Sequence, residues 1–182
     1  RINQVEYHPA YHDLMGIAIG NELPSFAWKY PQPGSQVVHA ALTYMFNQAE
    51  GGVLCPMAMT YAAVPALRMT PAVGDEWIPR LLSTSYDARD IPVAKKTGAT
   101  MGMFMTEKQG GSDVRSNTTR ATAVGAGQGE GAEYRLTGHK YFCSAPMSDA
   151  FLMLAYTEDG LSCFLVPRWM PDGERNHLFI QQ

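Results

Sequence analysis

The spacing of the apolar residues changes near Thr100, and this change restricts how the chain can fold. Before this point, apolar residues recur three and four positions apart, which is the period of an α-helix. After it, the chain alternates and runs in short segments rich in β-formers, which is typical of strands. Helices followed by strands predict an α+β fold.

Three helices are expected in the first part. Val37 to Phe46 present a broad apolar face, with Ser35 as a plausible N-cap. Val53 to Thr70 carries almost no charge, so we expect a helix that is buried on most sides and kinked at Pro65. Asp75 to Leu82 predicts one further short helix.

The second part predicts a β-domain of five strands. Residues 83–98 hold turn formers, charges and a proline, so we place the domain boundary there, giving an α-helical domain at 1–95 and a β middle domain at 96–182. An antiparallel β-barrel or sandwich is the expected packing. The expected strands are Thr118 to Val124, Glu133 to Leu136, Lys140 to Cys143, Phe151 to Tyr156 and Leu161 to Val166.

The glycine-rich segment Gly125 to Gly131 lies between the first two expected strands. It lacks GxGxxG spacing and the lysine of a phosphate-binding loop, and Glu130 would repel a phosphate. A flexible hairpin tip is therefore expected rather than a nucleotide loop.

Composition indicates an ordinary globular protein. The chain has 182 residues, 46% of them hydrophobic and 17% charged, with a net charge of −3. Tight binding to nucleic acid needs a clustered basic face, so this chain alone is expected to bind DNA poorly. It shows no apolar run long enough to predict a membrane span. Because it opens on Arg1 without a signal peptide, we expect an internal piece of a longer polypeptide.

Cysteines and histidines give no sign of a disulfide framework or a metal site. Cys55, Cys143 and Cys163 are odd in number and form no CxxC pair, which fits a reducing cytoplasm. His8 and His12 have a spacing that could hold zinc on a helix, but no third ligand is apparent. We predict no metal, and capping or surface roles for these histidines.

The segment from Met103 to Arg120 is the strongest candidate site. Gly110 and Gly111 can adopt positive φ, while Thr106, Ser112 and nearby main-chain N–H groups supply neutral donors for an anion. These features predict a cradle for a phosphate-bearing cofactor. The same Gly-Gly-Ser-Asp sequence is also common turn chemistry, so a purely structural turn is the alternative.

The segment resembles the flavin-binding signature of acyl-CoA dehydrogenases, Thr-Glu-Pro-x-x-Gly-Ser-Asp. Thr106, Glu107 and the run Gly111 to Asp113 stand at matching positions, while Lys108 replaces the usual proline and Gln109 follows it. This version resembles the AidB-like branch of the family, associated with the bacterial adaptive response to DNA alkylation. The similarity extends almost end to end, through His8-Pro9-Ala10, Leu54-Cys55-Pro56, Met59-Thr60, Gly138-His139-Lys140 and residues 164–173.

The resemblance implies FAD as the cofactor and two segments that contact it. The segment GHKYFCS resembles the family's Lys-x-Trp-Ile-Thr strand, which packs against the flavin, so Phe142, Cys143 and Ser144 take the places of Trp, Ile and Thr. Acyl-CoA contacts are implied for Thr106, Ser112 and Ser144, and Glu107 is implied to be structural rather than a base. The implied cofactor-binding residues are Met103, Phe104, Met105, Thr106, Glu107, Lys108, Gln109, Gly110, Gly111, Ser112, Phe142, Cys143 and Ser144.

The family's reaction is α,β-dehydrogenation of an acyl-CoA thioester with hydride transfer to flavin N5. Its catalytic carboxylate lies in a C-terminal helical domain, so no catalytic residue is expected here and the piece alone should not dehydrogenate. The resemblance also implies a homo-oligomer, a tetramer in the full protein, and weak FAD binding by the isolated piece, with apolar helix faces exposed. The alternative is a flavin-containing DNA-protection protein with little turnover, which binds DNA through a C-terminal region absent here.

Overall fold

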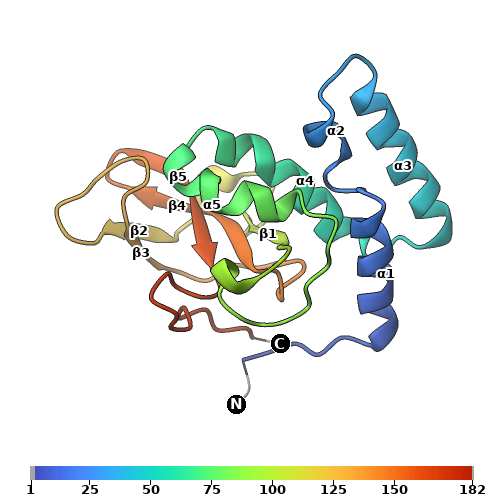
Figure 1. Ribbon diagram of the computed structural model, residues 1–182. Coiled ribbons are helices and arrows are strands. Elements are labelled where there is room, and N and C mark those ends of the chain that lie inside the picture. Colours follow the sequence, from blue (N-terminus) through green and yellow to red (C-terminus); the bar gives the residue numbers. More distant parts are fainter. Residues whose placement is uncertain (1–2, 182) are drawn as a thin grey trace.

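The computed structural model describes residues 3–181, with the helices preceding the strands along the chain (Figure 1). None of these helices has both the length and the apolar character needed to cross a bilayer. The helices are α1 (Pro9–Gly20), α2 (Phe26–Lys29), α3 (Ser35–Ala49), α4 (Leu54–Arg68) and α5 (Pro71–Leu81), with short 3₁₀ turns η1 (Val93–Lys95) and η2 (Val114–Ser116); the strands are β1 (Met101–Phe104), β2 (Arg120–Ala123), β3 (Tyr134–Thr137), β4 (Ala150–Thr157) and β5 (Gly160–Pro167).

The helix ends differ in detail from those expected. Ser35 is the first residue of α3 rather than its N-cap; Gly34 occupies the cap with φ +92°. The Ser35 hydroxyl instead accepts from the main-chain N–H of Gln32 at 3.1 Å and donates to the carbonyl of Tyr30. Helix α5 starts a turn earlier than expected, at Pro71, because proline suits the first helical position.

Helix α4 is confirmed but is buried along one side, not most sides. Met57, Val64 and Leu67 are among its buried residues, while Ala58 and Ala62 are exposed. The lack of charge predicts wide burial, but several uncharged residues of the helix are alanines. Alanine is small enough to face water at little cost, so an uncharged run does not by itself set the buried arc.

The expected order of helical region and β-domain is confirmed, but the sheet is mixed rather than antiparallel and is not closed. Strand β4 pairs antiparallel with β5 along its full length and parallel with β1 and, at one position, with β2. Strands β2 and β3 form the antiparallel hairpin expected around the glycine-rich tip. Long connections separate β1 and β2 from β4, and such connections permit parallel pairing.

Four of the five expected strands are confirmed within one or two residues at each end. The strand expected at Lys140 to Cys143 is wrong, because Phe142 and Ala145 have φ near +57° and +51°, which interrupts a ladder. A single bridge between Met103 and Ser144 remains. Strand β1 was not anticipated, because its four residues adjoin the glycine-rich segment and show no clear alternation.

The helices and the sheet share a core. Leu67 of α4 and Trp77 of α5 pack with Met101 of β1 and Leu152 of β4, so α4 and α5 cover one face of the sheet (Figure 1). The buried hydroxyl of Thr60 accepts from the N–H of Met101 at 3.0 Å and so ties α4 to the start of β1. The boundary placed at 95/96 stays a prediction.

Candidate functional site

Two segments far apart in the sequence meet beside β1. We call residues 105–119 the cradle loop and residues 138–145 the crossing loop. The N–H of Tyr141 donates to the carbonyl of Thr106 at 3.0 Å, and the Thr106 hydroxyl donates to the carbonyl of Tyr141. With the bridge between Met103 and Ser144, these bonds hold the two loops side by side.

Glu107 is the centre of the hydrogen-bond network between the loops. Its side chain accepts from both the N–H and the hydroxyl of Thr118, at 2.7 and 2.8 Å, and of Thr119, at 3.0 and 2.6 Å. The Nζ of Lys140 lies 3.1 Å from the Oε1 of Glu107. Both side chains of this ion pair are almost fully buried, at 3% and 5% exposed. The carboxylate is thus saturated by partners from both loops.

These contacts determine the charge state of Glu107. Burial raises the pKa of the Glu107 carboxyl, but the hydrogen bonds from Thr119 and Thr118 outweigh burial and hold the pKa well below its usual range. Glu107 is therefore ionised at neutral pH. A carboxylate with a low pKa and bonded oxygens is a poor proton acceptor, so it cannot serve as a general base.

The turn of the cradle loop is held by its own main chain and side chains. The N–H of Gly110 donates to the carbonyl of Glu107 at 2.9 Å, with Gly110 at φ +124°. The Gln109 amide donates to the carbonyl of Ser116 at 3.1 Å. A Cβ at Gly111 would lie 2.4 Å from the Cγ2 of Thr106, so a side chain there would have to displace Thr106. The glycine keeps the backbone close to Thr106.

The outer rim of the two loops carries groups that are free to contact a ligand. Residues 108–113, which include Ser112, are exposed, and so is Ser144. Phe142 is 78% exposed, although its φ of +57° is uncommon for an aromatic residue. An exposed aromatic side chain in a constrained backbone conformation marks a place where another molecule could pack.

The structure separates the expected cofactor-contacting residues into groups. Met103 and Met105 pack towards the helix-covered core, whereas Phe104 stacks on Phe151 on the opposite face, with ring centroids 3.9 Å apart. Because side chains alternate along a strand, those of Met103 and Phe104 lie on opposite faces of the sheet, and the cofactor contacts expected of these residues stay predictions. Cys143 packs on the core that contains Phe104, and burial raises the pKa of its thiol to about 11 despite the nearby Lys140.

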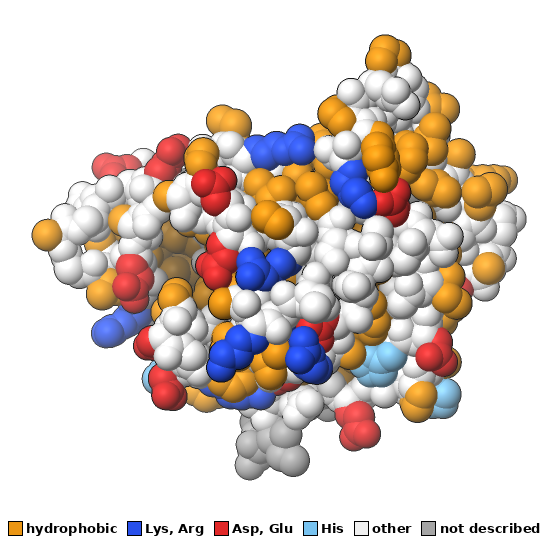
Figure 2. All heavy atoms as spheres, viewed as in Figure 1, with side chains coloured by type: hydrophobic (Ala, Val, Ile, Leu, Met, Phe, Trp, Pro, Cys, Tyr) orange, Lys and Arg blue, Asp and Glu red, His pale blue; other side chains and the backbone are white. Residues whose placement is uncertain are grey.

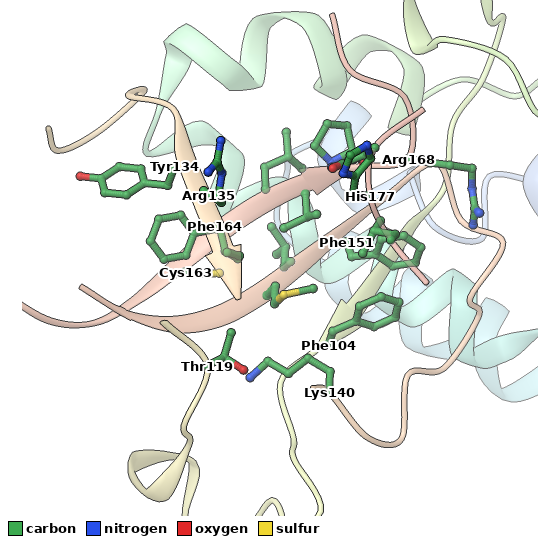
Figure 3. A pocket seen from close by; sticks show the side chains of 18 of the residues that line it. Phe104, Thr119, Tyr134, Arg135, Lys140, Phe151, Cys163, Phe164, Arg168 and His177 are labelled. Atoms are coloured by element: carbon green, nitrogen blue, oxygen red, sulfur yellow. The ribbon is translucent and has the colours of Figure 1, made fainter. Parts of the chain in front are cut away.

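A large cavity runs along the open sheet, and its lining includes Leu67 of α4 and Trp77 of α5 as well as side chains of the face that these helices leave uncovered. It measures about 1910 Å³, and Figure 3 shows Phe104 and Phe151 on one side of it and Tyr134 and Phe164 on the other. Its lining reaches the crossing loop at Lys140. The cavity follows from a sheet that is not closed, and its floor is the apolar side of β4 and β5.

Sequence reasoning missed the partners of Glu107. Thr118 and Thr119 stood out only as part of a hydroxyl-rich tail, and Lys140 only as one of a basic pair. The sequence did hold a signal for these threonines. A structural carboxylate such as Glu107 needs hydrogen-bond donors, and two adjacent threonines offer four, namely two main-chain N–H groups and two hydroxyls. The contact between Glu107 and Lys140 could not be predicted from local sequence, because the two residues are 33 positions apart and only the fold brings them together.

His8 and His12, whose spacing could hold zinc on a helix, have protein groups as hydrogen-bond partners. The Nδ1 of His8 accepts from the N–H of Ala10 at 3.2 Å, and the Nδ1 of His12 lies 2.8 Å from the hydroxyl of Tyr86. Within residues 3–181, no group of three His, Cys, Asp or Glu side chains could hold a metal ion.

Comparison with known proteins gives a family for this combination of helical region, mixed sheet and cradle loop. The family model of the adaptive response protein AidB N-terminal domain matches residues 1–88, and that of the acyl-CoA dehydrogenase middle domain matches residues 102–177. The chain therefore belongs to the acyl-CoA dehydrogenase family, in its AidB-like branch.

Individual relatives agree with this assignment. The putative acyl-CoA dehydrogenase AidB of Escherichia coli K12 is 47% identical over the whole chain, which spans 33% of that protein. The apo form of Bd2924 superimposes with a TM-score of 0.81 at 30% identity, over 97% of this chain and 35% of that one. Caenorhabditis elegans ACDH-11, in complex with C11-CoA, gives a TM-score of 0.76 at 30% identity, over 97% of this chain and 30% of that one. The chain thus spans about a third of the length of these relatives.

Proposed function

We propose that this chain is the flavin-facing part of an FAD-dependent, acyl-CoA dehydrogenase-like protein. The observation that carries the proposal is that the cradle and crossing loops meet beside β1 and carry Phe142 and Ser144 on an exposed rim. Family membership and the acyl-CoA complex of the relative ACDH-11 support it.

The residues present fit a flavin nucleotide. Gly110 is at positive φ with nothing within 4 Å of the place where its Cβ would lie, and residues 108–112 are exposed, so their backbone is open to close approach. Main-chain N–H groups in such a turn can bind a pyrophosphate without lysines. An exposed aromatic ring at Phe142 offers an apolar surface for a planar ring system.

Each group has a role that this chain can perform. We assign pyrophosphate binding to the main chain of residues 108–112 with the Ser112 hydroxyl, and assign Phe142 and Ser144 to packing against and hydrogen bonding with the flavin ring. Thr106 has already donated its hydroxyl hydrogen to Tyr141, so towards a ligand its oxygen can only accept. Bound FAD supplies the hydride-accepting chemistry that the side chains lack.

We assign no catalytic residue within residues 3–181. Glu107 lies in the cradle loop, but its depressed pKa and bonded oxygens exclude it as the base that removes an α-proton. Dehydrogenation of an acyl-CoA thioester is therefore proposed for the complete gene product. The acyl-CoA contacts expected at Thr106, Ser112 and Ser144 belong to the same proposal.

Within residues 3–181, no structural observation favours the DNA-protection alternative. On the face in Figure 2, Lys and Arg side chains are interspersed with acidic ones rather than gathered in a stripe. A DNA-binding role of the complete protein would need a basic surface elsewhere.

An anaerobic visible spectrum of the complete gene product, before and after adding isovaleryl-CoA, tests the proposal. We expect flavin bands that bleach when the substrate is added. Bands that persist would exclude this substrate and favour other acyl chains or DNA protection. A protein without flavin bands after incubation with FAD would refute the proposal. Alanine at Thr106 and at Ser144 should each weaken FAD binding.

A further inference from the structure

We propose that Glu107 and Lys140 are positioning residues whose buried ion pair sets the orientation of the crossing loop against the cradle loop. The pair would thereby hold Phe142 and Ser144 in the arrangement that contacts the flavin ring. This inference rests on the proposed function, because it concerns the same cofactor site. It assigns a role to two side chains that are almost fully buried beneath the exposed rim.

The first step of the argument is that the pair connects the loops at a buried point. Glu107 is held in the cradle loop by the N–H and hydroxyl groups of Thr118 and Thr119. Lys140 enters from the crossing loop and approaches both Glu107, at 3.1 Å, and the carbonyl of Met105, at 3.5 Å. A buried ammonium without these acceptors would be strongly unfavourable, so the position of Lys140 is narrowly determined.

The second step follows the crossing loop outward from Lys140. The next residue, Tyr141, exchanges two hydrogen bonds with Thr106, which immediately precedes Glu107. Two consecutive residues of one loop are therefore matched to two consecutive residues of the other. The backbone direction on entering Phe142 is set by these contacts rather than by a β-ladder.

The third step concerns the conformation of Phe142. A φ of +57° is unfavourable for an aromatic residue and persists only where the surroundings impose it. Lys140 and Tyr141 restrain the preceding residues, and the bridge of Ser144 to Met103 restrains those that follow. The ion pair thus stabilises a strained turn that exposes an aromatic ring and a hydroxyl on the same rim.

The experiment uses the complete gene product with four variants. Glu107→Gln and Lys140→Met each break the pair, and Thr119→Val removes one donor to Glu107 with little change in shape. Lys96→Met is the matched control, because it breaks another buried ion pair, with Asp149, in which neither loop takes part. The measurements are the FAD dissociation constant of the apoprotein, the visible circular dichroism of bound flavin, and the melting temperature.

We expect Glu107→Gln and Lys140→Met to weaken FAD binding by about tenfold, because loops that are no longer held together must be brought into the binding arrangement when FAD binds. The circular dichroism of the remaining bound flavin should also change. Thr119→Val should show the same changes to a smaller extent. Lys96→Met should lower the melting temperature but leave the spectrum of the bound flavin unaltered.

The outcomes separate the two proposals. If the wild-type protein binds FAD but the flavin spectra of the site variants match that of Lys96→Met, the positioning role is overturned and the proposed function stands. If Glu107→Gln and Lys140→Met fail to fold, Thr119→Val decides by the same criterion. A wild-type protein that does not take up FAD overturns both proposals.

Discussion

Helices α3 and α4 are alike in sequence but opposite in environment. Each has 15 residues, α3 contains no charged residue, and α4 contains one, Arg68. Yet α4 buries seven residues, packing against α1 and α5 as well as the sheet, whereas Ser35 is the one buried residue of α3. Val37 and Tyr44 of α3 are 72% and 69% exposed. In Figure 2, hydrophobic side chains gather over the part of the molecule where Figure 1 shows α2 and α3.

This difference shows that an apolar sequence pattern does not by itself bury a helix; another element must pack against the apolar face. Helix α4 packs on α5 and the sheet through Leu67 and on α1 through Met57, and Thr60 fastens it to β1. Helix α3 rests on the rest of the helical region mainly through Leu42 and Phe46, and through the ring of His39 stacked on Tyr61. An apolar surface of this kind favours association with another molecule or segment.

The largest expected difference between the two helices is in how much a truncated side chain lowers the free energy of unfolding. Leu67→Ala in α4 should lower the free energy of unfolding by about 2–5 kcal/mol, because it opens a cavity among Trp77, Met101 and Leu152. Val37→Ala in α3 should change it by at most about 0.5 kcal/mol, because the side chain already faces water. Urea unfolding followed by circular dichroism measures both. Equal losses in the two variants would contradict the comparison.

Threonine hydroxyls in the two helices provide the next test. Thr60→Val should cost about 1–3 kcal/mol of unfolding free energy, because the N–H of Met101 loses its buried acceptor. Thr43→Val removes a hydroxyl that bonds to the carbonyl of His39 within α3, and should be nearly neutral. A neutral Thr60→Val would mean that the contact between α4 and β1 does not anchor the sheet. The same urea titration reports on both variants.

The attachment of α3 should depend on pH through His39. Burial lowers the pKa of His39, an effect opposed by a hydrogen bond with the main chain of Leu23, and the Nδ1 atom of His39 is buried without a partner. Because the folded pKa of His39 lies below the unfolded value of about 6.5, its contribution to the free energy of unfolding is complete above about pH 6.5 and is lost as the pH falls from there through the folded pKa. Tyr61, and Trp28 beyond it, are the rings of this stack.

His39→Phe keeps an aromatic ring in the stack but removes the titrating group. Between about pH 8 and pH 5, the urea midpoint of the wild type should therefore fall further than that of the variant. Parallel decreases in the two proteins would show that His39 does not contribute to the pH dependence.

The smallest effect on stability is expected on the outer face of α3. Val37→Lys together with Tyr44→Lys should leave the free energy of unfolding within about 0.5 kcal/mol of wild type. The same double variant should reduce concentration-dependent association, measured by analytical ultracentrifugation, because it places charges on an exposed apolar surface. A double variant that unfolds readily would show that this face is packed within the chain.

Much of the fold could be predicted from local patterns. The helical period located α3, α4 and most of α5, and alternation located β4 and β5. The prediction was wrong where contacts with distant segments override the local sequence pattern. The run at Lys140 to Cys143 has the composition of a strand, but Lys140 is drawn to Glu107 and Phe142 takes a positive φ.

In the candidate site, too, some features could be predicted from the local sequence and others depend on the fold. The glycines and hydroxyls of the cradle loop were recognisable because their chemistry lies within one short segment. The side-chain directions of Met103 and Phe104 were not, because they depend on how β1 pairs with β4. The orientation and cofactor contacts of Phe142 and Ser144 remain predictions.

The sequence by itself determined the helical and strand regions, the turn of the cradle loop and the resemblance to acyl-CoA dehydrogenases, because each is encoded by neighbouring residues. Tertiary structure alone decided that β4 pairs in both directions, that α3 lies exposed while α4 is buried, and that Lys140 completes the shell of Glu107. Period and composition specify which face of an element is apolar. Which partner covers that face, and which charge a buried carboxylate meets, depends on segments brought together by the whole chain.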